Sequence, residues 1–411
     1  MEKEIKNQLK ILIVSQYFWP EKFIINDLAI GLKEEYEIDV LTGYPNYPEG
    51  SIFSNFKKNK KKFNNLKKIN IFRVPIIPRK KNKFFLFLNY MSFLITSSIF
   101  IIFFLKKKYD LVFTYQTSPV TAGICSTLLK KIKKTKHIMW VQDLWPDTIY
   151  NLKIFKSKLI LKFIKKVSIY VYKNCDCLIS QSDGIKKKLN RYLNKKVRNI
   201  TVRNWAEADF DSLKKSYKLK YPKKKNKNFD IMFAGNIGEA QDIESILKCI
   251  KLTKEYDKNI RWIFLGKGSM FEWLSIQKKK LHLDNLYLLG SKPLKLMSSY
   301  YNLSDALLVS LKPGPAFEIV VPSKFVTYLK SSKPILGMIN GETNKIINKN
   351  KIGLSCGSSK YLQLFKNIKK LKKNYPYLKK KISHTSKDLY NKSFNRNKQI
   401  LEIKKIFENL R

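Results

Sequence analysis

Residues 10–32, KILIVSQYFWPEKFIINDLAIGL, decide the fold class. The apolar run Ile11–Ser15 predicts a short buried strand, and an aromatic loop follows it. The segment after the loop places four apolar residues at i, i+3, i+4 and i+7, which is the spacing of one buried helical face. A continuous apolar strand followed by a one-sided helix is typical of a parallel sheet that helices cover on both faces.

The same alternation of apolar runs and helical segments continues along the chain. The predicted strands of the first half are Ile11–Ser15, Ile38–Thr42, Ile69–Val74, Asp110–Tyr115, His137–Val141, Cys177–Ser180 and Ile200–Val202. Those of the second half are Phe229–Ala234, Arg261–Leu265, Asn285–Leu289, Ala306–Leu311 and Pro334–Ile339. We therefore predict an α/β protein with two facing Rossmann-like, doubly wound domains and a cleft between them.

The predicted domain boundaries follow changes in composition. An N-terminal domain covers residues 1–205, and a Lys-rich linker of low apolar content covers 206–228. A second domain covers 229–387, and a helix over 388–411 returns toward the first domain.

Composition narrows the classes of function. The chain has 411 residues, and 82 Lys and Arg against 31 Asp and Glu give a formal net charge of +51. This charge fits nucleic acid, an anionic membrane surface, or compositional drift without a partner. The lysines are scattered rather than gathered in a binding motif, so we do not expect nucleic acid as a partner. Five Cys without paired spacing and three His far apart argue against disulfides and a metal centre.

The segment Phe84–Leu105 carries no charge and is long enough to cross a bilayer. Three alternatives remain open: a helix or hairpin in the membrane surface, a buried domain helix, or a true span. The first is favoured because strands before and after the segment belong to one sheet. Seven flanking cations are expected to attract anionic lipid: Arg79, Lys80, Lys81, Lys83, Lys106, Lys107 and Lys108. Since the N-terminal residues do not resemble a signal peptide, we expect a peripheral or monotopic protein on the cytoplasmic face of the membrane.

Polar and aromatic residues follow three strands of the first domain, at the edge where parallel sheets bind ligands. The candidates for a substrate site are Gln16, Tyr17, Trp19, Asn46, Tyr47 and Trp145, with Gln142 and Asp143 as candidate catalytic residues. A carboxylate at a strand tip suits a sugar hydroxyl or general base work. The alternatives are loops packed on their own domain and an aspartate that caps the next helix.

Glycines follow the strands of the second domain, where they let backbone N–H groups approach phosphate oxygens. The candidates for a nucleotide-diphosphate site are Gly235, Asn236, Gly238, Gly266, Lys267, Pro322, Ser323 and Lys324. A helix that begins at Pro322 and Ser323 adds its positive end, and Lys324 adds a point charge for a leaving diphosphate.

Five motifs together resemble glycosyltransferase family 4. They are ILIVSQYFWPE (11–21), LTGYPNYPEG (41–50), WVQDLWP (140–146), GNIGEAQD (235–242) and VPSK (321–324). The resemblance extends over nearly the whole chain and favours the bacterial subgroup that builds O-antigen, capsule or colanic-acid repeats, including N-acetyl-L-fucosaminyl transferases.

This resemblance implies a GT-B fold and metal-independent transfer of an N-acetylated hexose with retention, without a cofactor. It implies a nucleotide-sugar donor, by family habit UDP-linked, and an undecaprenyl-diphosphate-linked acceptor in lipopolysaccharide, O-antigen or capsule synthesis. The alternatives to a transferase are a basic nucleic-acid-binding protein and an integral membrane protein.

The family motifs also assign residues. Gln142 and Asp143 stand where many relatives have His-Asp, and the Gly235 loop and Lys324 match the motifs that hold the nucleotide end. This chain departs from the pattern at Asn236 and Gln241, where many members have Arg and Lys. It also has Thr327 in place of the second Glu of a Glu-x7-Glu motif, and Glu318 is a further candidate for the missing carboxylate.

Overall fold

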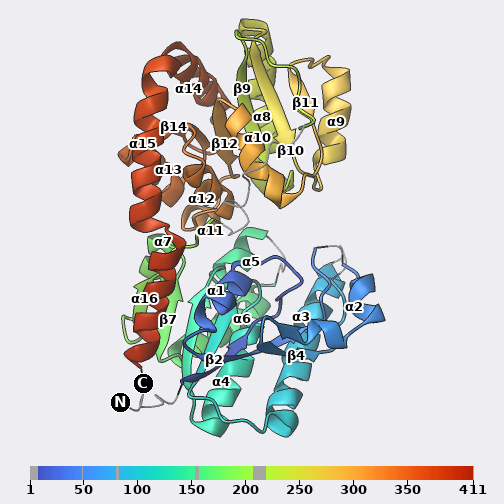
Figure 1. The fold of residues 1–411 in the computed structure, drawn as a ribbon, viewed down its shortest axis with the longest axis vertical. Helices are drawn as coiled ribbons and strands as arrows, with labels where there is room; N and C mark the ends of the chain where they lie inside the picture. The colour runs from blue at the N-terminus through green and yellow to red at the C-terminus, as the bar shows by residue number, and fades with distance from the viewer. Residues whose placement is uncertain (1–7, 49, 80–82, 153–156, 207–218, 411) are drawn as a thin grey trace, which may run out of the picture. The chain divides into compact units, whose positions relative to one another are not determined.

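A computed structural model describes residues 8–48, 50–79, 83–152, 157–206 and 219–410 of the chain. The chain forms two compact units, which we treat separately (Figure 1). Unit 1 comprises residues 1–203 and 397–411, and unit 2 comprises residues 204–396.

Unit 1 is built on an eight-stranded sheet with the order β3-β4-β2-β1-β5-β6-β7-β8. Its strands are β1 (Lys10–Val14), β2 (Glu37–Gly43), β3 (Asn65–Leu66), β4 (Ile69–Val74), β5 (Leu111–Gln116), β6 (Lys136–Val141), β7 (Cys177–Ser180) and β8 (Arg198–Thr201). All pairs are parallel except the short β3–β4 pair. The carboxyl ends of the parallel strands therefore lie along one edge of the sheet.

Helices cover both faces of this sheet. They are α1 (Ile24–Leu32), α2 (Ser54–Lys58), α3 (Lys83–Ile99), α4 (Thr121–Lys133), α5 (Asp147–Leu152), α6 (Lys158–Lys173), α7 (Asp183–Tyr192) and α16 (Arg396–Glu408), with a 3-10 turn η1 (Lys61–Phe63) and a π-helical turn η2 (Phe100–Phe104). On one face, α3 and α4 pack on Leu12, Val112 and their neighbours. On the other face, Phe407 of α16 packs edge-on against Phe113 at 5.6 Å between ring centroids.

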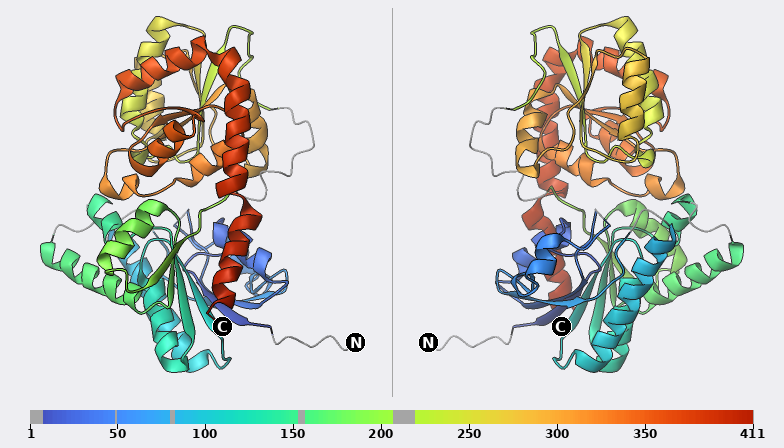
Figure 2. Two further views of the ribbon diagram at one scale, coloured as in Figure 1. Left: turned by 90° about the vertical axis from the view of Figure 1, so that its left-hand side faces the viewer. Right: turned by 90° about the vertical axis from the view of Figure 1, so that its right-hand side faces the viewer.

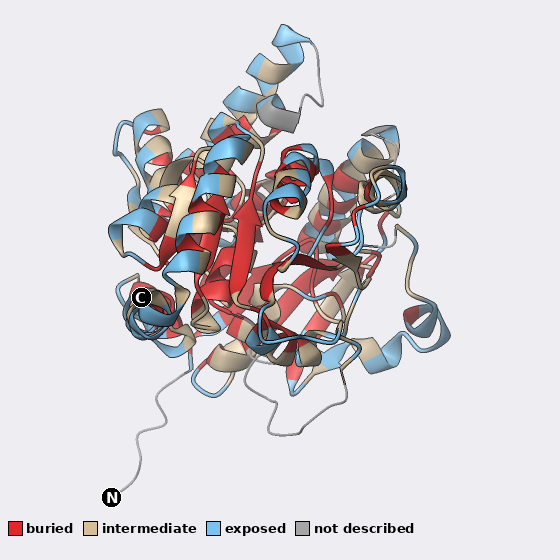
Figure 3. Ribbon diagram, turned by 90° about the horizontal axis from the view of Figure 1, so that it is seen from above, coloured by how far each residue is buried: buried red, intermediate tan, exposed pale blue. Residues whose placement is uncertain are grey.

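Unit 2 has a six-stranded, wholly parallel sheet with the order β11-β10-β9-β12-β13-β14. Its strands are β9 (Phe229–Ala234), β10 (Ile260–Leu265), β11 (Leu286–Leu288), β12 (Ala306–Ser310), β13 (Ile335–Met338) and β14 (Gly353–Cys356). Its helices are η4 (Glu239–Gln241), α8 (Ile243–Tyr256), α9 (Phe271–Lys280), η5 (Leu294–Leu296), α10 (Met297–Leu303), α11 (Pro315–Glu318), α12 (Ser323–Lys330), α13 (Gly341–Lys349), α14 (Tyr361–Lys373) and α15 (Tyr375–Ser393). Seen from above, the central strands are buried and the helices carry both buried and exposed residues (Figure 3).

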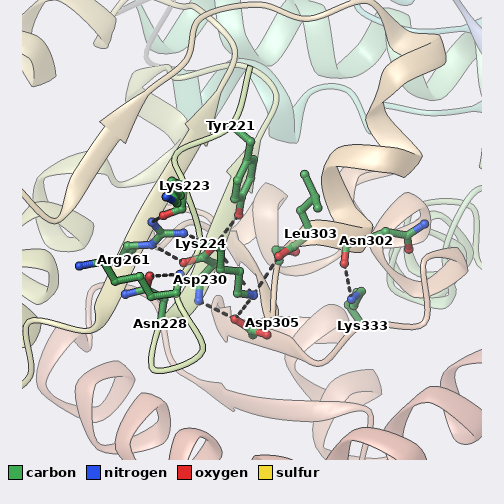
Figure 4. A network of polar contacts seen from close by, with 12 residues as sticks. Tyr221, Lys223, Lys224, Asn228, Asp230, Arg261, Asn302, Leu303, Asp305 and Lys333 are labelled. Carbon is green, nitrogen blue, oxygen red and sulfur yellow. Dashed lines mark hydrogen bonds and ion pairs between the residues drawn. The ribbon is translucent and has the colours of Figure 1, made fainter. Parts of the chain in front are cut away.

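A polar network ties the segment before β9 to the amino ends of the strands of unit 2 (Figure 4). The Arg261 guanidinium donates to both carboxylate oxygens of Asp230, at 2.7 and 2.8 Å, and both residues are buried. The Tyr221 hydroxyl donates to the same carboxylate at 2.8 Å, and Lys224 pairs with Asp305 at 2.7 Å. Removal of one partner of this buried charge pair would leave the other charge unpaired. The pair therefore holds this segment in place only while both partners are present.

The predicted strands agree with the structure, which adds β3 and β14. The predicted domain boundaries differ more from the structure than the predicted strands do. Residues 219–228 of the predicted linker belong to unit 2, whereas 207–218 lie outside the described residues. The predicted helix 388–411 is two helices, because α15 continues to Ser393 and the buried Phe394 packs against Phe325 at 6.1 Å. The second of them, α16, lies in unit 1 from residue 397 onward.

The apolar segment Phe84–Leu105 forms α3 and η2, with one face packed and one face exposed. It is the one described helix long and apolar enough to cross a membrane, with a mean hydropathy of 1.9 over Phe84–Phe104. Asn89, Tyr90 and Phe93 are buried, whereas Phe84, Ile95 and Phe103 are exposed. The polar side chains of Asn89 and Ser92 on this helix face unit 1, because the Asn89 side chain donates to the Ile77 carbonyl at 2.6 Å and the Ile77 N–H donates to Ser92 Oγ.

The seven cations that were predicted to attract anionic lipid differ in their contacts. Lys107 pairs with Glu37 and Asp39 at 2.7 and 2.6 Å. The Arg79 guanidinium lies over the Tyr47 ring, with 5.5 Å to the ring centroid. Lys106 and Lys108 are exposed, while Lys80 and Lys81 lie outside the described residues.

Candidate active site

The tips of β9 and β10 approach each other through two glycines in unit 2. Gly235 and Gly266 have φ angles of +122° and +130°, in the region that side chains rarely adopt. A Cβ atom on Gly266 would lie 1.8 Å from the Gly235 carbonyl oxygen, so no larger residue fits without separating the two loops. The two glycines thus bring backbone from neighbouring strands into one concave turn at the carboxyl edge.

Two further glycines enclose the Asn236 side chain. A Cβ on Gly238 would lie 2.8 Å from Asn236 Nδ2, and one on Gly268 would lie 2.4 Å from Asn236 Oδ1. The Ile237 N–H donates to the Lys267 carbonyl at 2.9 Å, so the backbone of Lys267 fixes the loop while its side chain is exposed.

Lys324 reaches this loop from the first turn of α12. Its Nζ donates to Gln241 Oε1 at 2.8 Å and lies 3.5 Å from the centroid of the Phe233 ring. Carbon Cε of Lys324 is 3.3 Å from the position of a Cβ on Gly235. Burial lowers the pKa of Lys324 to about 7, since its hydrogen-bond partner is a neutral amide. The site therefore holds a cation that gains stability when a negative charge arrives.

α12 is fixed to the same loop by Tyr328. The hydroxyl of Tyr328 accepts from the Ala234 N–H at 2.8 Å and donates to the Ala234 carbonyl at 3.2 Å. Since Tyr328 is one turn beyond Lys324 and fully buried, it sets the distance of the lysine from the strand tip.

Pro322 caps α12 and Ser323 is its exposed first residue, as the sequence predicted. Glu318 contacts a different part of unit 2: its Oε1 accepts from Asn340 Nδ2 at 3.2 Å, and its backbone packs on Gly341. The structure thus joins Gly235, Gly266 and Lys324 and places the contacts of Glu318 at α13 instead.

In unit 1, the Gln16 side chain after β1 is fixed by α3. Gln16 Nε2 donates to Asn89 Oδ1 at 2.7 Å, and the Tyr17 hydroxyl donates to the same oxygen at 3.3 Å. The Tyr17 ring lies 5.4 Å from the Tyr47 ring, so the tips of β1 and β2 come together.

Glu21 organises these loops, although no sequence pattern identified it as a site residue. The carboxylate accepts from the N–H groups of Asn46 and Tyr47 at 2.8 and 2.7 Å and from Phe18 N–H at 3.3 Å. Burial raises the pKa of Glu21 to about 7, and these N–H donors lower it in part. Trp19 lies apart from the Gln16 cluster, because it packs on Phe63 at 5.1 Å and Arg73 donates to its carbonyl.

Asp143 lies at the end of β6 and is held from β5. Its half-buried carboxyl is hydrogen-bonded to Ser118, and burial raises the pKa of Asp143 although those hydrogen bonds lower it. Gln116 Nε2 donates to the Asp143 carbonyl at 2.8 Å. Trp145 Nε1 donates to Ser118 Oγ at 3.0 Å, and the Trp145 ring meets Tyr90 edge-on at 6.5 Å. Burial also raises the pKa of Tyr90 to about 12.

Glutamines follow four adjacent strands of unit 1, and two of these glutamines, Gln16 and Gln142, are among the predicted site residues. Gln16 follows β1, Gln116 ends β5, Gln142 follows β6 and Gln181 follows β7. All four are buried, and the side-chain carbonyl oxygens of Gln16, Gln116 and Gln181 accept no hydrogen bond from the part of the chain that the structure describes. A buried acceptor of this kind is stabilised when a hydroxyl donates to it. The recurrence of Gln directly after apolar runs is the sequence signal that could have revealed Gln116 and Gln181.

The described residues contain no group of three or more His, Cys, Asp or Glu side chains placed to hold a metal ion.

Known proteins are similar to this chain over much of unit 2 and over nearly its whole length. Residues 215–388 match the family model described as "Glycosyl transferases group 1". An uncharacterized glycosyltransferase of Methanocaldococcus jannaschii is 23% identical over 98% of this chain and 99% of its own length. The chain is a glycosyltransferase.

Two more relatives bear on the enzyme. The putative teichuronic acid biosynthesis glycosyltransferase TuaH of Bacillus subtilis is 23% identical over half of each chain. The crystal structure of HepE from Anabaena in complex with UDP is 11% identical and has a TM-score of 0.67 over 98% of this glycosyltransferase and 100% of HepE. The glycosyltransferase therefore has the GT-B fold, with two Rossmann-like α/β domains.

Proposed function

We propose that this glycosyltransferase moves an N-acetylated hexose, with retention, from a UDP-sugar to an undecaprenyl-diphosphate-linked sugar. The reaction would extend a surface polysaccharide at the cytoplasmic face of the membrane. The observation that carries the proposal is Lys324, whose ammonium group lies at the Gly235 loop and pairs with no carboxylate among the described residues.

The donor assignment rests on charge and backbone geometry in unit 2. Lys324, the first turn of α12 and the glycine turn at Gly235 and Gly266 offer a cation and closely approachable backbone to a diphosphate. HepE, which shares the fold, binds UDP, and this supports a uridine nucleotide as the donor group.

The proposed chemistry needs no strong base. The acceptor hydroxyl oxygen forms a bond to the anomeric carbon while the bond from that carbon to the diphosphate oxygen breaks on the same face. The hydroxyl proton passes to the departing diphosphate oxygen, and UDP leaves. Lys324 stabilises the negative charge that develops on the diphosphate, which is the charge the protein must neutralise in the transition state.

The acceptor assignment rests on the hydrogen-bonding groups of unit 1. The free carbonyl oxygens of Gln16 and Gln116 and the Asp143 carboxyl suit sugar hydroxyls, and Tyr47 supplies an aromatic surface beside them. Asp143 would orient the attacking hydroxyl rather than remove its proton.

The membrane assignment rests on α3. This helix packs one face on unit 1 and exposes the opposite apolar face, as expected of a helix that lies in a membrane surface. The relation to TuaH, a putative teichuronic acid biosynthesis enzyme, supports a surface polymer as the product.

The test is a panel of UDP-sugars read by thermal shift, followed by transfer to undecaprenyl-diphosphate N-acetylglucosamine in lipid vesicles. We expect one UDP-sugar to raise the melting temperature and to give a product whose new linkage keeps the donor's anomeric configuration in NMR spectra. Lys324→Ala should lower turnover more than tenfold. Lys330→Ala is the matched control, since Lys330 lies on the same helix over the Tyr390 ring at 5.7 Å. Equal turnover in both variants, or inversion in the product, would contradict the proposal.

A further inference from the structure

The helix α6 exposes large apolar side chains along one outward face. Leu159 and Phe163 are 79% and 67% exposed, and Tyr170 is 48% exposed. These residues lie at i, i+4 and i+11 of one helix, so they share a single stripe. The inner side of the helix is packed, because Ser168, Val171 and Tyr172 are buried. The exposed stripe is therefore not part of the core of unit 1.

Lysines border this stripe. Lys162 and Lys166 are exposed and lie at i+3 and i+7 from Leu159, next to Phe163 on the helix surface. Among the described residues, no carboxylate forms an ion pair with either lysine. By contrast, Lys165 lies over the Tyr192 ring, with 5.6 Å to the centroid. The outward face of α6 thus has an apolar centre and a cationic margin.

The stripe projects from the same helical layer that carries the exposed face of α3. α4 contacts both α3 and α6, so the three helices lie on one face of the sheet of unit 1. Both side views show the first turns of α6 extending beyond the neighbouring helices of this unit (Figure 2). Residues 157–166 include no buried residue, so this end of the helix projects from the unit.

We propose that the outward face of α6 is a second membrane-docking element, which inserts Leu159 and Phe163 among the acyl chains of an anionic bilayer. Lys162 and Lys166 then lie at the level of the phosphates. This inference deepens the proposed function, since it names where a lipid-linked acceptor would be met.

Charge and shape favour a bilayer over a second copy of the chain as the occupant. Two copies of this face would bring Lys162 and Lys166 against the same lysines, on a protein with a net charge of +51. A projecting apolar stripe with a cationic margin suits an anionic bilayer, because amphipathic helices insert their apolar face into such a surface. The docking role also supplies exposed cations in addition to Lys106 and Lys108, which flank the paired Lys107 after α3.

The first test measures vesicle binding by sedimentation, with phosphatidylglycerol-containing and pure phosphatidylcholine vesicles. We expect the full-length protein to prefer the anionic vesicles. Leu159→Ser with Phe163→Ser should weaken binding roughly 100-fold or more, because two large apolar side chains no longer insert. The matched control is Leu362→Ser with Tyr377→Ser, two helical residues of unit 2 that are 56% and 76% exposed. Equal binding of the two double variants would overturn the proposal.

A double charge-reversal variant tests the contribution of the two lysines at the cationic margin. Lys162→Glu with Lys166→Glu should weaken binding to anionic vesicles about 30-fold or more and leave the phosphatidylcholine signal unchanged. The control is Lys366→Glu with Lys370→Glu, an exposed i, i+4 pair on α14 of unit 2. If the control pair weakens binding equally, general charge and not α6 attracts the lipid, and the proposal fails.

A labelling experiment separates docking from folding and from the transferase activity. The five native cysteines are buried, so Leu159→Cys can carry an environment-sensitive fluorophore on the intact protein. Anionic vesicles should shift its emission to the blue, whereas a label at Leu362→Cys should not respond. A blue shift that follows protein concentration without lipid would instead show a second copy on this face, and no shift would refute docking. Transfer to a short-chain, water-soluble acceptor needs no membrane. Loss of this transfer would therefore count against the proposed function. Retention of this transfer would not rescue a docking proposal that the other tests had refuted.

Discussion

The state of Lys324 leads to a measurable coupling between nucleotide binding and proton uptake. Burial lowers the pKa of its ammonium group to about 7, and its hydrogen-bond partner is the neutral side chain of Gln241. A diphosphate beside Nζ would supply the missing negative charge and raise this pKa again. Binding of UDP above pH 7 should therefore take up a proton from solution, and affinity should fall as the pH rises.

The magnitude follows from the pKa. If only the ammonium form binds, the fraction of competent protein is about one quarter at pH 7.5 and about 3% at pH 8.5. The dissociation constant for UDP should then rise about eightfold over this interval, with an uptake of about 0.8 proton per UDP at pH 7.5. UDP itself is fully ionised there, because the second pKa of a phosphate is about 6.

The assay is isothermal titration calorimetry of UDP in buffers of different ionisation enthalpy, phosphate and Tris, at pH 7.5 and 8.5. The proton number is the slope of observed enthalpy against buffer ionisation enthalpy. Lys324→Arg should keep affinity while it loses the pH dependence, because a guanidinium stays charged throughout. Wild-type affinity that does not change with pH, or equal proton uptake in Lys324→Met, would refute the assignment of Lys324 to the diphosphate.

Three other perturbations test the scaffold of the site. Arg261→Met should cost about 3–5 kcal/mol of unfolding free energy in urea, because Asp230 would remain buried and unpaired, and Asp230→Asn in the same chain should restore part of it. Gly266→Ala should weaken UDP binding more than tenfold in calorimetry, since its Cβ would overlap the Gly235 carbonyl; unchanged binding would mean that the loop is not the nucleotide site. Glu21 has a folded-state pKa of about 7, raised by burial from an ordinary value near 4.5, so its contribution to stability decreases as the pH rises from 5 to 7.5. Relative to wild type, Glu21→Gln should thus gain about 2 kcal/mol of unfolding free energy over that interval, and a difference that does not vary with pH would contradict the burial of this carboxyl.

The sequence predicted those features that depend on neighbouring residues along the chain. Strand β1 contains the continuous apolar run Ile11–Val14, and such runs are buried whichever strands flank them. The start of α12 could be predicted because proline and serine mark a helix start. By contrast, β14 has the sequence GLSC, which lacks an apolar run, and pairing with β13 determines it instead.

The sequence did not reveal features that arise from contacts between distant segments. Gln16 meets Asn89 across 73 positions, and no local pattern relates the two residues. Lys107 looked like a membrane-facing cation, yet the fold brings Glu37 and Asp39 to it. Glu21 looked like an ordinary loop residue, and only its burial against the N–H groups after β2 shows its structural role.

The two sheet edges differ in polarity, and this difference bears on which substrate each one binds. The edge of unit 2 offers the Lys324 cation and close backbone approach at Gly235, which attract an anion. The edge of unit 1 offers the carbonyl oxygens of Gln16 and Gln116 and the Asp143 carboxyl, which accept hydrogen bonds from hydroxyls. If the nucleotide bound to unit 1 and the sugar hydroxyl bound to unit 2, the buried acceptors and the lysine would both remain without partners. The polarity of the described side chains thus favours a sugar hydroxyl on unit 1 and the nucleotide on unit 2, independently of the motifs from which the same division was first predicted.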